Sequence, residues 1–222
     1  VAVDTETVST SDRTLLGIGV AINKNEAFYV TPDEGERFWQ VIEILRSSDV
    51  KTIYHNAPFD LRVLREYRVN YHNIDDTAIM ARLKYGWAVL EDVAMRELML
   101  EVESAKSFLD RYGAKNMRAA PPDAVAYKCA VDATATYAIW ESLRSDTDPE
   151  YYGVEIRVAS LLEKISQRGL RLDQDRREFL QTHYTRERGF LLEIARGMGF
   201  NPGSPQQVGF ILQKRHNFLP LT

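Results

Sequence analysis

The sequence has little of what marks a secreted or membrane protein. Its single cysteine, Cys129, excludes a disulfide framework within the chain, favours a reducing compartment and is expected to be a small buried side chain. No apolar run approaches the roughly 20 residues that a membrane-spanning helix needs. The first residues, Val1–Asp4, lack the basic region and cleavage site of a signal peptide, and there is no initiator Met. We therefore expect a piece of a longer protein that has no membrane partner.

Charge is unevenly distributed along the chain. The 222 residues suffice for one full core and a smaller appendage, and they carry a net charge of −4. Residues 1–150 have a net charge of −8 and residues 151–222 one of +4. Basic surface can bind phosphate and clustered carboxylates can bind metal, but ordinary variation in surface charge accounts for the asymmetry equally well.

The first half of the sequence alternates strand-like and helix-like runs. Two apolar runs flank a polar turn at 23–25, which predicts an antiparallel pair of strands. The alternation indicates an α/β fold with a mixed sheet. The predicted strands are 1–4, 15–22, 27–30 and 52–55, and the predicted helices between and after them are 36–47 and 59–67.

From Asp76 onward the chain is predicted to be helical. A polar segment, Ser145–Pro149, is a plausible domain boundary because it ends in Pro. Beyond it, apolar residues recur from Val154 to Ile165 on one helical face. Asp173 and Ser204 are predicted to cap two further helices. The earlier predicted helices are 77–84, 91–99 and 123–143, with a loop at 113–122.

Three acidic elements are candidates for chemistry. Asp4 and Glu6 follow an apolar strand at positions i and i+2, so both carboxylates lie on one face, where a divalent cation would relieve their repulsion. Asp60 falls in the first turn of a predicted helix, and Asp132 lies among Cys, Ala and Val. Each element also has a simpler explanation. Asp4 and Glu6 could be a solvated strand end, Asp60 a helix cap, and Asp132 the partner of an arginine in a salt bridge.

The order of these elements is more specific than any one of them. The segments DTET (4–7), HNAPFDLRVL (55–64), DDTAIMARL (75–83) and DATATYAIW (132–140) resemble the motifs of the DEDD exonucleases in the family A DNA polymerase branch. The resemblance implies an RNase H-like α/β fold, a mixed five-stranded sheet flanked by helices. It also implies that Asp4, Glu6, Asp60 and Asp132 are the catalytic acids.

The resemblance continues into the basic tail. Residues 154–173 and 200–212 are similar to the start of the polymerase thumb in this family. The implied division is an exonuclease domain at 1–148 and an all-helical, N-terminal part of the polymerase region at 149–222. The fingers and palm are absent from the sequence, so we expect synthesis from the parent protein and not from this chain.

The implied cofactors are two divalent cations, Mg²⁺ or Mn²⁺. Asp4 is expected to bridge them, with Glu6 and Asp132 completing the first site and Asp60 holding the second. The expected reaction is 3′→5′ removal of 5′-mononucleotides from DNA.

One departure from the family pattern concerns the helix that carries Asp132. The family places a Tyr four residues before the last acid, whereas this chain has Lys128 there and Tyr127 one residue earlier. A π-bulge could bring Tyr127 into place, Lys128 could itself contact the scissile phosphate or the water, or the site could be weakened.

Several residues are expected to contact DNA. Thr7 and Asn56 resemble residues that contact the terminal nucleotide, and Phe59 is either a stacking surface or a core side chain. The candidates for holding a primer-template duplex by its phosphates, or else ordinary solvated surface, are Arg168, Arg171, Lys214 and Arg215.

The expected partners are a single-stranded DNA 3′ end, the duplex and the remainder of the polymerase. We expect a monomer in the cytoplasm of a bacterial or phage-infected cell, or in an organelle. Two rival interpretations stay open: an RNase D-like enzyme acting on RNA, against which the thumb-like tail speaks, and a vestigial fold that braces the polymerase.

Overall fold

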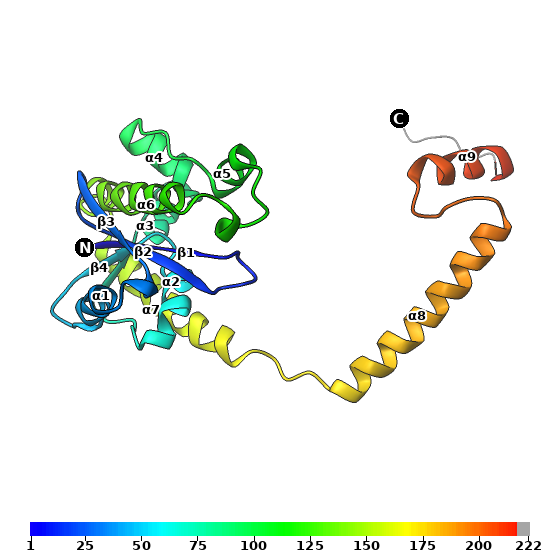
Figure 1. The fold of residues 1–222 in the computed structure, drawn as a ribbon, viewed down its shortest axis with the longest axis horizontal. Coiled ribbons are helices and arrows are strands. Elements are labelled where there is room, and N and C mark those ends of the chain that lie inside the picture. Colours follow the sequence, from blue (N-terminus) through cyan, green and yellow to red (C-terminus); the bar gives the residue numbers. More distant parts are fainter. Residues whose placement is uncertain (217–222) are drawn as a thin grey trace. The chain divides into compact units, whose positions relative to one another are not determined.

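The computed structural model of the chain describes the backbone of residues 1–216 and the side chains of residues 1–214. It forms two compact units, one from Val1 to Arg168 and one that begins at Gly169 (Figure 1). Within the described residues, no helix combines the length and apolar character needed to cross a membrane.

A mixed five-stranded sheet forms the centre of the first unit. The strands lie in the order β3-β2-β1-β4-β5, with β1, β2 and β3 antiparallel and β1, β4 and β5 parallel. The predicted sheet is therefore confirmed, and its fifth strand has only three residues, too few to show a periodic pattern in the sequence. The strands are β1 (Ala2–Thr7), β2 (Leu15–Asn23), β3 (Glu26–Val30), β4 (Thr52–Tyr54) and β5 (Ile74–Asp76).

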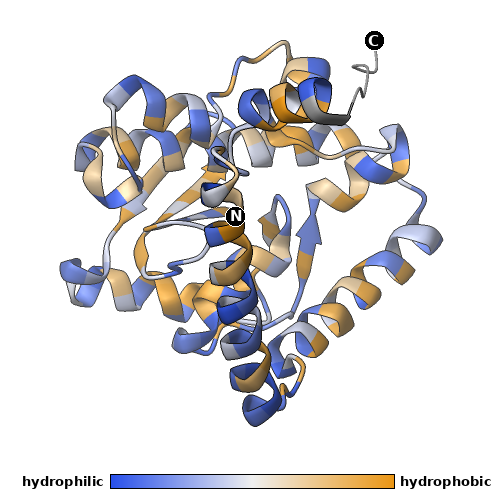
Figure 2. Cartoon of the chain, turned by 90° about the vertical axis from the view of Figure 1, so that its right-hand side faces the viewer, coloured by the Kyte–Doolittle hydropathy of each residue, from blue (hydrophilic) through white to orange (hydrophobic). Residues whose placement is uncertain are grey.

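Helices lie between and after the strands along the chain, as the predicted α/β alternation indicates. The predicted helix at 59–67 is shorter, because the chain tightens into a 3₁₀ turn at Arg65–Tyr67. The helices of this unit are α1 (Glu36–Arg46), α2 (Ala57–Leu64), α3 (Thr77–Tyr85), α4 (Leu90–Leu98), α5 (Ala105–Tyr112), α6 (Pro122–Leu143) and α7 (Pro149–Arg168), with further 3₁₀ turns at Pro32–Glu34 and Met117–Ala119. Hydrophobic residues recur between hydrophilic ones along the helices, as amphipathic helices require (Figure 2).

Alternate residues of β1 face different helices. Val3 belongs to the apolar cluster that α1 and α2 complete, whereas Ala2 packs with Ala21, Ile53 and Ala133 of α6. The small side chains on this second side let α6 lie close to the sheet. The period of two along β1 therefore directs Asp4 and Glu6 toward α6.

Gly19 permits the closest approach of α6. It is the cross-strand partner of Asp4 on β2, and a Cβ atom built there would lie 2.7 Å from the carbonyl oxygen of Cys129. Real Cβ atoms do not come so close to backbone, so only glycine fits. Cys129 is fully buried, as the sequence predicts.

Helix α7 is part of the first unit. The Tyr152 hydroxyl donates to Asp75 Oδ1 at 3.1 Å and accepts from the backbone N–H of Asp76 at 2.7 Å. Glu163, 2% exposed, accepts two hydrogen bonds from Arg65 of the 3₁₀ turn after α2 at 2.8 and 2.9 Å. The compact unit thus ends 20 residues beyond the predicted division at 148/149.

The second unit contains α8 (Gln174–Gly197) and α9 (Pro205–His216). Both predicted caps form, since Asp173 accepts from the N–H of Arg176 at 2.9 Å and Ser204 Oγ from that of Gln207 at 3.4 Å. Of α8 only Ala195 is buried, so in the described part of the chain this helix has little core of its own.

Candidate metal and catalytic site

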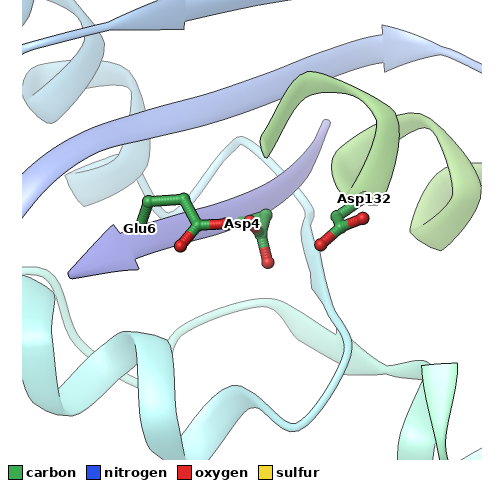
Figure 3. A group of neighbouring side chains, drawn as sticks. All are labelled: Asp4, Glu6 and Asp132. Carbon is green, nitrogen blue, oxygen red and sulfur yellow. The ribbon is translucent and has the colours of Figure 1, made fainter. Parts of the chain in front are cut away.

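Three carboxylates converge where β1 and α6 meet. Asp4 and Glu6 project from the same face of β1, and Asp132 reaches them from α6 (Figure 3). One ligand oxygen from each lies within 4.8 Å of the others. The structure thus brings together three of the four acids that the sequence predicts for the metal site.

Burial and mutual repulsion favour the protonated forms of these acids. Burial, followed by the charge of Asp4, raises the pKa of Glu6 to about 8. The same two causes in the same order raise the pKa of Asp132 to about 7. Burial also raises the pKa of Asp4, although Lys128 and a hydrogen bond from Cys129 oppose the shift. The site therefore destabilises the ionised forms of these three carboxylates. A cation bound among them would offset their repulsion and stabilise the folded protein.

The fourth acid, Asp60, is held beside β1 by Thr5, whose side chain points to the opposite face of the strand from Asp4 and Glu6. Its Oδ1 accepts hydrogen bonds from the backbone N–H of Thr5 at 2.9 Å and from the Thr5 hydroxyl at 2.7 Å. Asp60 is 3% exposed; burial raises its pKa well above the usual range, and the charge of Asp4 adds to the shift. It is near enough to sense Asp4 but is not among the three clustered acids.

Lys128, and not Tyr127, occupies the position beside the acids. Helix α6 is regular throughout, so no π-bulge turns Tyr127 inward, and that side chain is 74% exposed. The Lys128 ammonium contacts Asp132 Oδ2 and lies 3.7 Å from Glu6 Oε1. Burial lowers the pKa of Lys128, but the attraction of Asp132 and Glu6 outweighs this and raises it above its usual range. No bulge therefore brings Tyr127 into the helix position before Asp132, and its catalytic role stays a prediction.

The supporting contacts of two residues, Cys129 and Asp76, were not evident in the sequence. The Cys129 thiol donates to Asp4 Oδ2 at 3.2 Å. Asp76 accepts from the N–H groups of Asn56 and Ala57 at 3.0 and 2.9 Å, and also from Ala78 N–H at 2.9 Å. It therefore ties the turn that starts α2 to the cap of α3. The only sequence signal for this role was the Asp-Thr pair that opens the predicted helix at 77–84.

The residues predicted to contact a nucleotide differ in exposure. Asn56 is exposed in a left-handed conformation (φ 74°), Phe59 is half-buried, and Thr7 is buried with its hydroxyl donating to Ser9 O at 3.1 Å. Asn56 is the only one of the three with a freely accessible side chain.

The predicted phosphate-binding residues lie at and beyond the end of α7. Arg168 and Arg171 are exposed, and Lys214 lies 4.7 Å from the centre of the Phe210 ring on α9. The side chain of Arg215 lies outside the described residues.

The mixed sheet, its strand order and its flanking helices define an RNase H-like fold, and the acidic cluster lies where β1 meets α6. The sequence profile of the 3′-5′ exonuclease family of DNA polymerase A type matches residues 1–148, and the chain belongs to this family. The resemblance to the family A exonucleases and the predicted fold class are therefore confirmed.

Relatives link the chain to polymerases over nearly its whole length. It is 27% identical over 220 residues to DNA polymerase I of Chloroflexus aurantiacus, an alignment that covers 89% of this chain but 23% of that protein. The polymerase domain of Pol1 from M. smegmatis, solved with a DNA primer-template and dNTP, has a TM-score of 0.58 at 21% identity and covers 96% of this chain and 35% of its own. The chain therefore spans the exonuclease family region and the start of a polymerase.

Other solved structures share the fold. NrnC of Brucella melitensis with bound Mg²⁺ has a TM-score of 0.56 at 16% identity and covers 76% of this chain and 85% of its own. At such identity the likeness establishes the fold alone.

Proposed function

We propose that this chain is the proofreading part of a DNA-directed DNA polymerase, a 3′→5′ exodeoxyribonuclease that releases 5′-mononucleotides. The convergence of Asp4, Glu6 and Asp132 within a chain of this exonuclease family is the observation that carries the proposal. The parent protein, through its palm and fingers, would supply the synthesis that this chain lacks.

The acids suit a hard divalent cation. Asp132 Oδ1 is buried and has no hydrogen-bond partner, so it is free to act as a ligand. Carboxylate oxygens suit Mg²⁺ or Mn²⁺, and the Mg²⁺-bound NrnC shares the fold. We propose two such ions: Asp4, Glu6 and Asp132 would hold the first, and Asp60 with Asp4 would hold the second. When bound, they supply the charge that lowers the pKa of an attacking water and neutralises the leaving oxygen.

Neighbouring residues of the chain hold the four carboxylates in position. Thr5 fixes Asp60 through two hydrogen bonds, Cys129 fixes Asp4, and Lys128 holds Asp132 and Glu6. With rotamers fixed in this way, the carboxylates need little rearrangement during the reaction.

The substrate is proposed to be the single-stranded 3′ end of DNA. Asn56, exposed at the start of α2, would contact the terminal nucleotide together with Thr7, and Phe59 offers a stacking surface. The proposed duplex contacts are Arg168, Arg171, Lys214 and Arg215. The monomeric state and the cytoplasmic or organellar location stay predictions.

A weakened or vestigial exonuclease is the alternative, and Lys128 favours it. The ammonium occupies part of the carboxylate surface that metal would use. An RNA-trimming enzyme is less consistent with the chain, because the similarity to DNA polymerase I extends through the tail.

Digestion of 5′-labelled single-stranded DNA with Mg²⁺ or Mn²⁺ tests the proposal, with Asp4→Ala as the control. A ladder that shortens from the 3′ end and vanishes in the mutant is expected. If both proteins are folded and neither produces a ladder, the vestigial alternative holds.

A further inference from the structure

A lysine lies inside the acidic cluster. Lys128 is 8% exposed, and it contacts Asp132 one helical turn along α6 and Glu6 across on β1. The two carboxylate side chains are 10% exposed or less. The three groups therefore face one another with little water between them.

The Lys106–Asp110 pair of α5 shows how unusual this burial is. It has the same spacing of four residues and an N···O distance of 3.6 Å, but its side chains are 90% and 70% exposed. Water screens such a surface pair, whereas the pair at Lys128 is shielded from solvent, so its attraction is much stronger.

The charge of the cluster fits a single divalent ion. Ionised, Asp4, Glu6 and Asp132 carry three negative charges, and Lys128 neutralises one of them. The remaining charge equals that of one divalent cation. The lysine engages Oδ2 of Asp132, while Oδ1 of the same carboxylate is buried without a partner. One oxygen of the Asp132 carboxylate thus contacts the ammonium, and the other is available to a metal ion.

We propose that Lys128 is a built-in counter-ion that competes with divalent metal for Glu6 and Asp132. The ion proposed for Asp4, Glu6 and Asp132 then binds well only when the ammonium is displaced, and the ion proposed for Asp60 with Asp4 is the tighter of the two. This deepens the proposed metal site and rests on it. The lysine acts as a positioning and charge-compensating residue, and it keeps the acidic cluster stable between metal-binding events.

Mn²⁺ binding without DNA tests this directly. Calorimetric titration of the wild-type chain should give one tight ion and a second that is at least roughly tenfold weaker. Lys128→Met, which keeps the stem and removes the charge, should tighten the weaker ion by roughly tenfold. Lys128→Arg, which keeps the charge, should behave like the wild type.

Stability without metal gives an independent readout. In EDTA, Lys128→Met should melt below the wild type, because the carboxylates lose their counter-ion, and Mn²⁺ should raise its melting temperature by more than it raises that of the wild type. Lys106→Met, the matched surface variant, should change neither the melting temperature in EDTA nor the increase that Mn²⁺ produces. If Lys128→Met does not fold in either condition, Lys128→Gln is measured in its place.

Equal Mn²⁺ affinities in the wild type and the neutral variant would overturn the proposal, as would weaker binding by that variant or no binding by any protein. Equal or weaker binding by the neutral variant is independent of DNA digestion, whereas no binding by any protein would also overturn the proposed metal site. A nuclease assay can therefore fail while the competition holds, and the competition can fail in an active nuclease.

Discussion

Thr5 donates two hydrogen bonds to a single oxygen of Asp60, from its backbone N–H at 2.9 Å and its hydroxyl at 2.7 Å. Thr5 stands between Asp4 and Glu6 on β1 but faces the opposite side of the strand. One strand thus supplies two carboxylates and, through Thr5, anchors a third. The position of Asp60 depends on a residue that carries no charge.

Replacing Thr5 with Val should remove the hydroxyl bond while keeping the shape of the side chain. We expect a loss of about 1–2 kcal/mol in the free energy of unfolding, because buried Asp60 loses a donor. Urea denaturation measures the loss, and DNA digestion should slow at the same time. Thr10→Val, at an exposed position, should change stability by less than about 0.5 kcal/mol. Equal stability of the two variants would contradict the structural role of this hydrogen bond.

The stability of the metal-free protein should fall as pH rises from 6.5 to 8. The pKa values of Glu6 and Asp132 are raised to about 8 and about 7, so in this window the folded state holds protons that the unfolded state has released. Below this window His55, whose pKa is lowered by burial, acts in the opposite direction. Melting in EDTA measures the effect, at roughly 2–4 °C for each kcal/mol lost.

Metal and mutation should both flatten this pH dependence. Saturating Mg²⁺ stabilises the ionised acids, and Asp132→Asn removes one of the titrating groups. A melting temperature in EDTA that rises between pH 6.5 and 8 would contradict the raised pKa values.

Gly19→Ala should push α6 away from the sheet. The added Cβ would meet the Cys129 carbonyl oxygen at 2.7 Å, and backbone cannot move aside cheaply. We expect a loss of about 1–3 kcal/mol in unfolding free energy, with weaker metal binding because Asp132 moves with the helix. Gly153→Ala is the matched control: it lies in α7 with nothing within 4 Å of the added Cβ, and should be neutral or slightly stabilising. Equal stability of the two variants would show that α6 is not held so closely.

The sequence predicts much of the site because the chemistry is local. Two acids at i and i+2 after an apolar strand necessarily share a face, and an acid among Cys, Ala and Val is placed toward the interior. Asp4 and Glu6 share a face as their spacing predicts, and Asp132 lies close to them as the order of the motifs implies. Asp60 is also buried at the start of α2, although its partner on β1 could not be inferred from helix capping.

Other features depend on long-range geometry. The choice between Tyr127 and Lys128 required the actual path of α6, because a regular helix and a π-bulge are equally compatible with the sequence. The attachment of α7 was missed since it depends on contacts between residues far apart in the sequence, such as Arg65 and Glu163, which are 98 positions apart. Its predicted apolar face, from Val154 to Ile165, is instead largely exposed within the described residues.

The attachment of α7 also determines where the chain can be divided. A cut after Asp148, at the end of the family match, would remove Tyr152 from Asp75 and Asp76, and Glu163 from Arg65. Asp76 supports the turn that carries Asn56, so the damage would reach the candidate catalytic region. A cut after Arg168 would spare all of these contacts. For protein engineering, the smallest transferable nuclease module therefore includes the helix whose sequence resembles the polymerase.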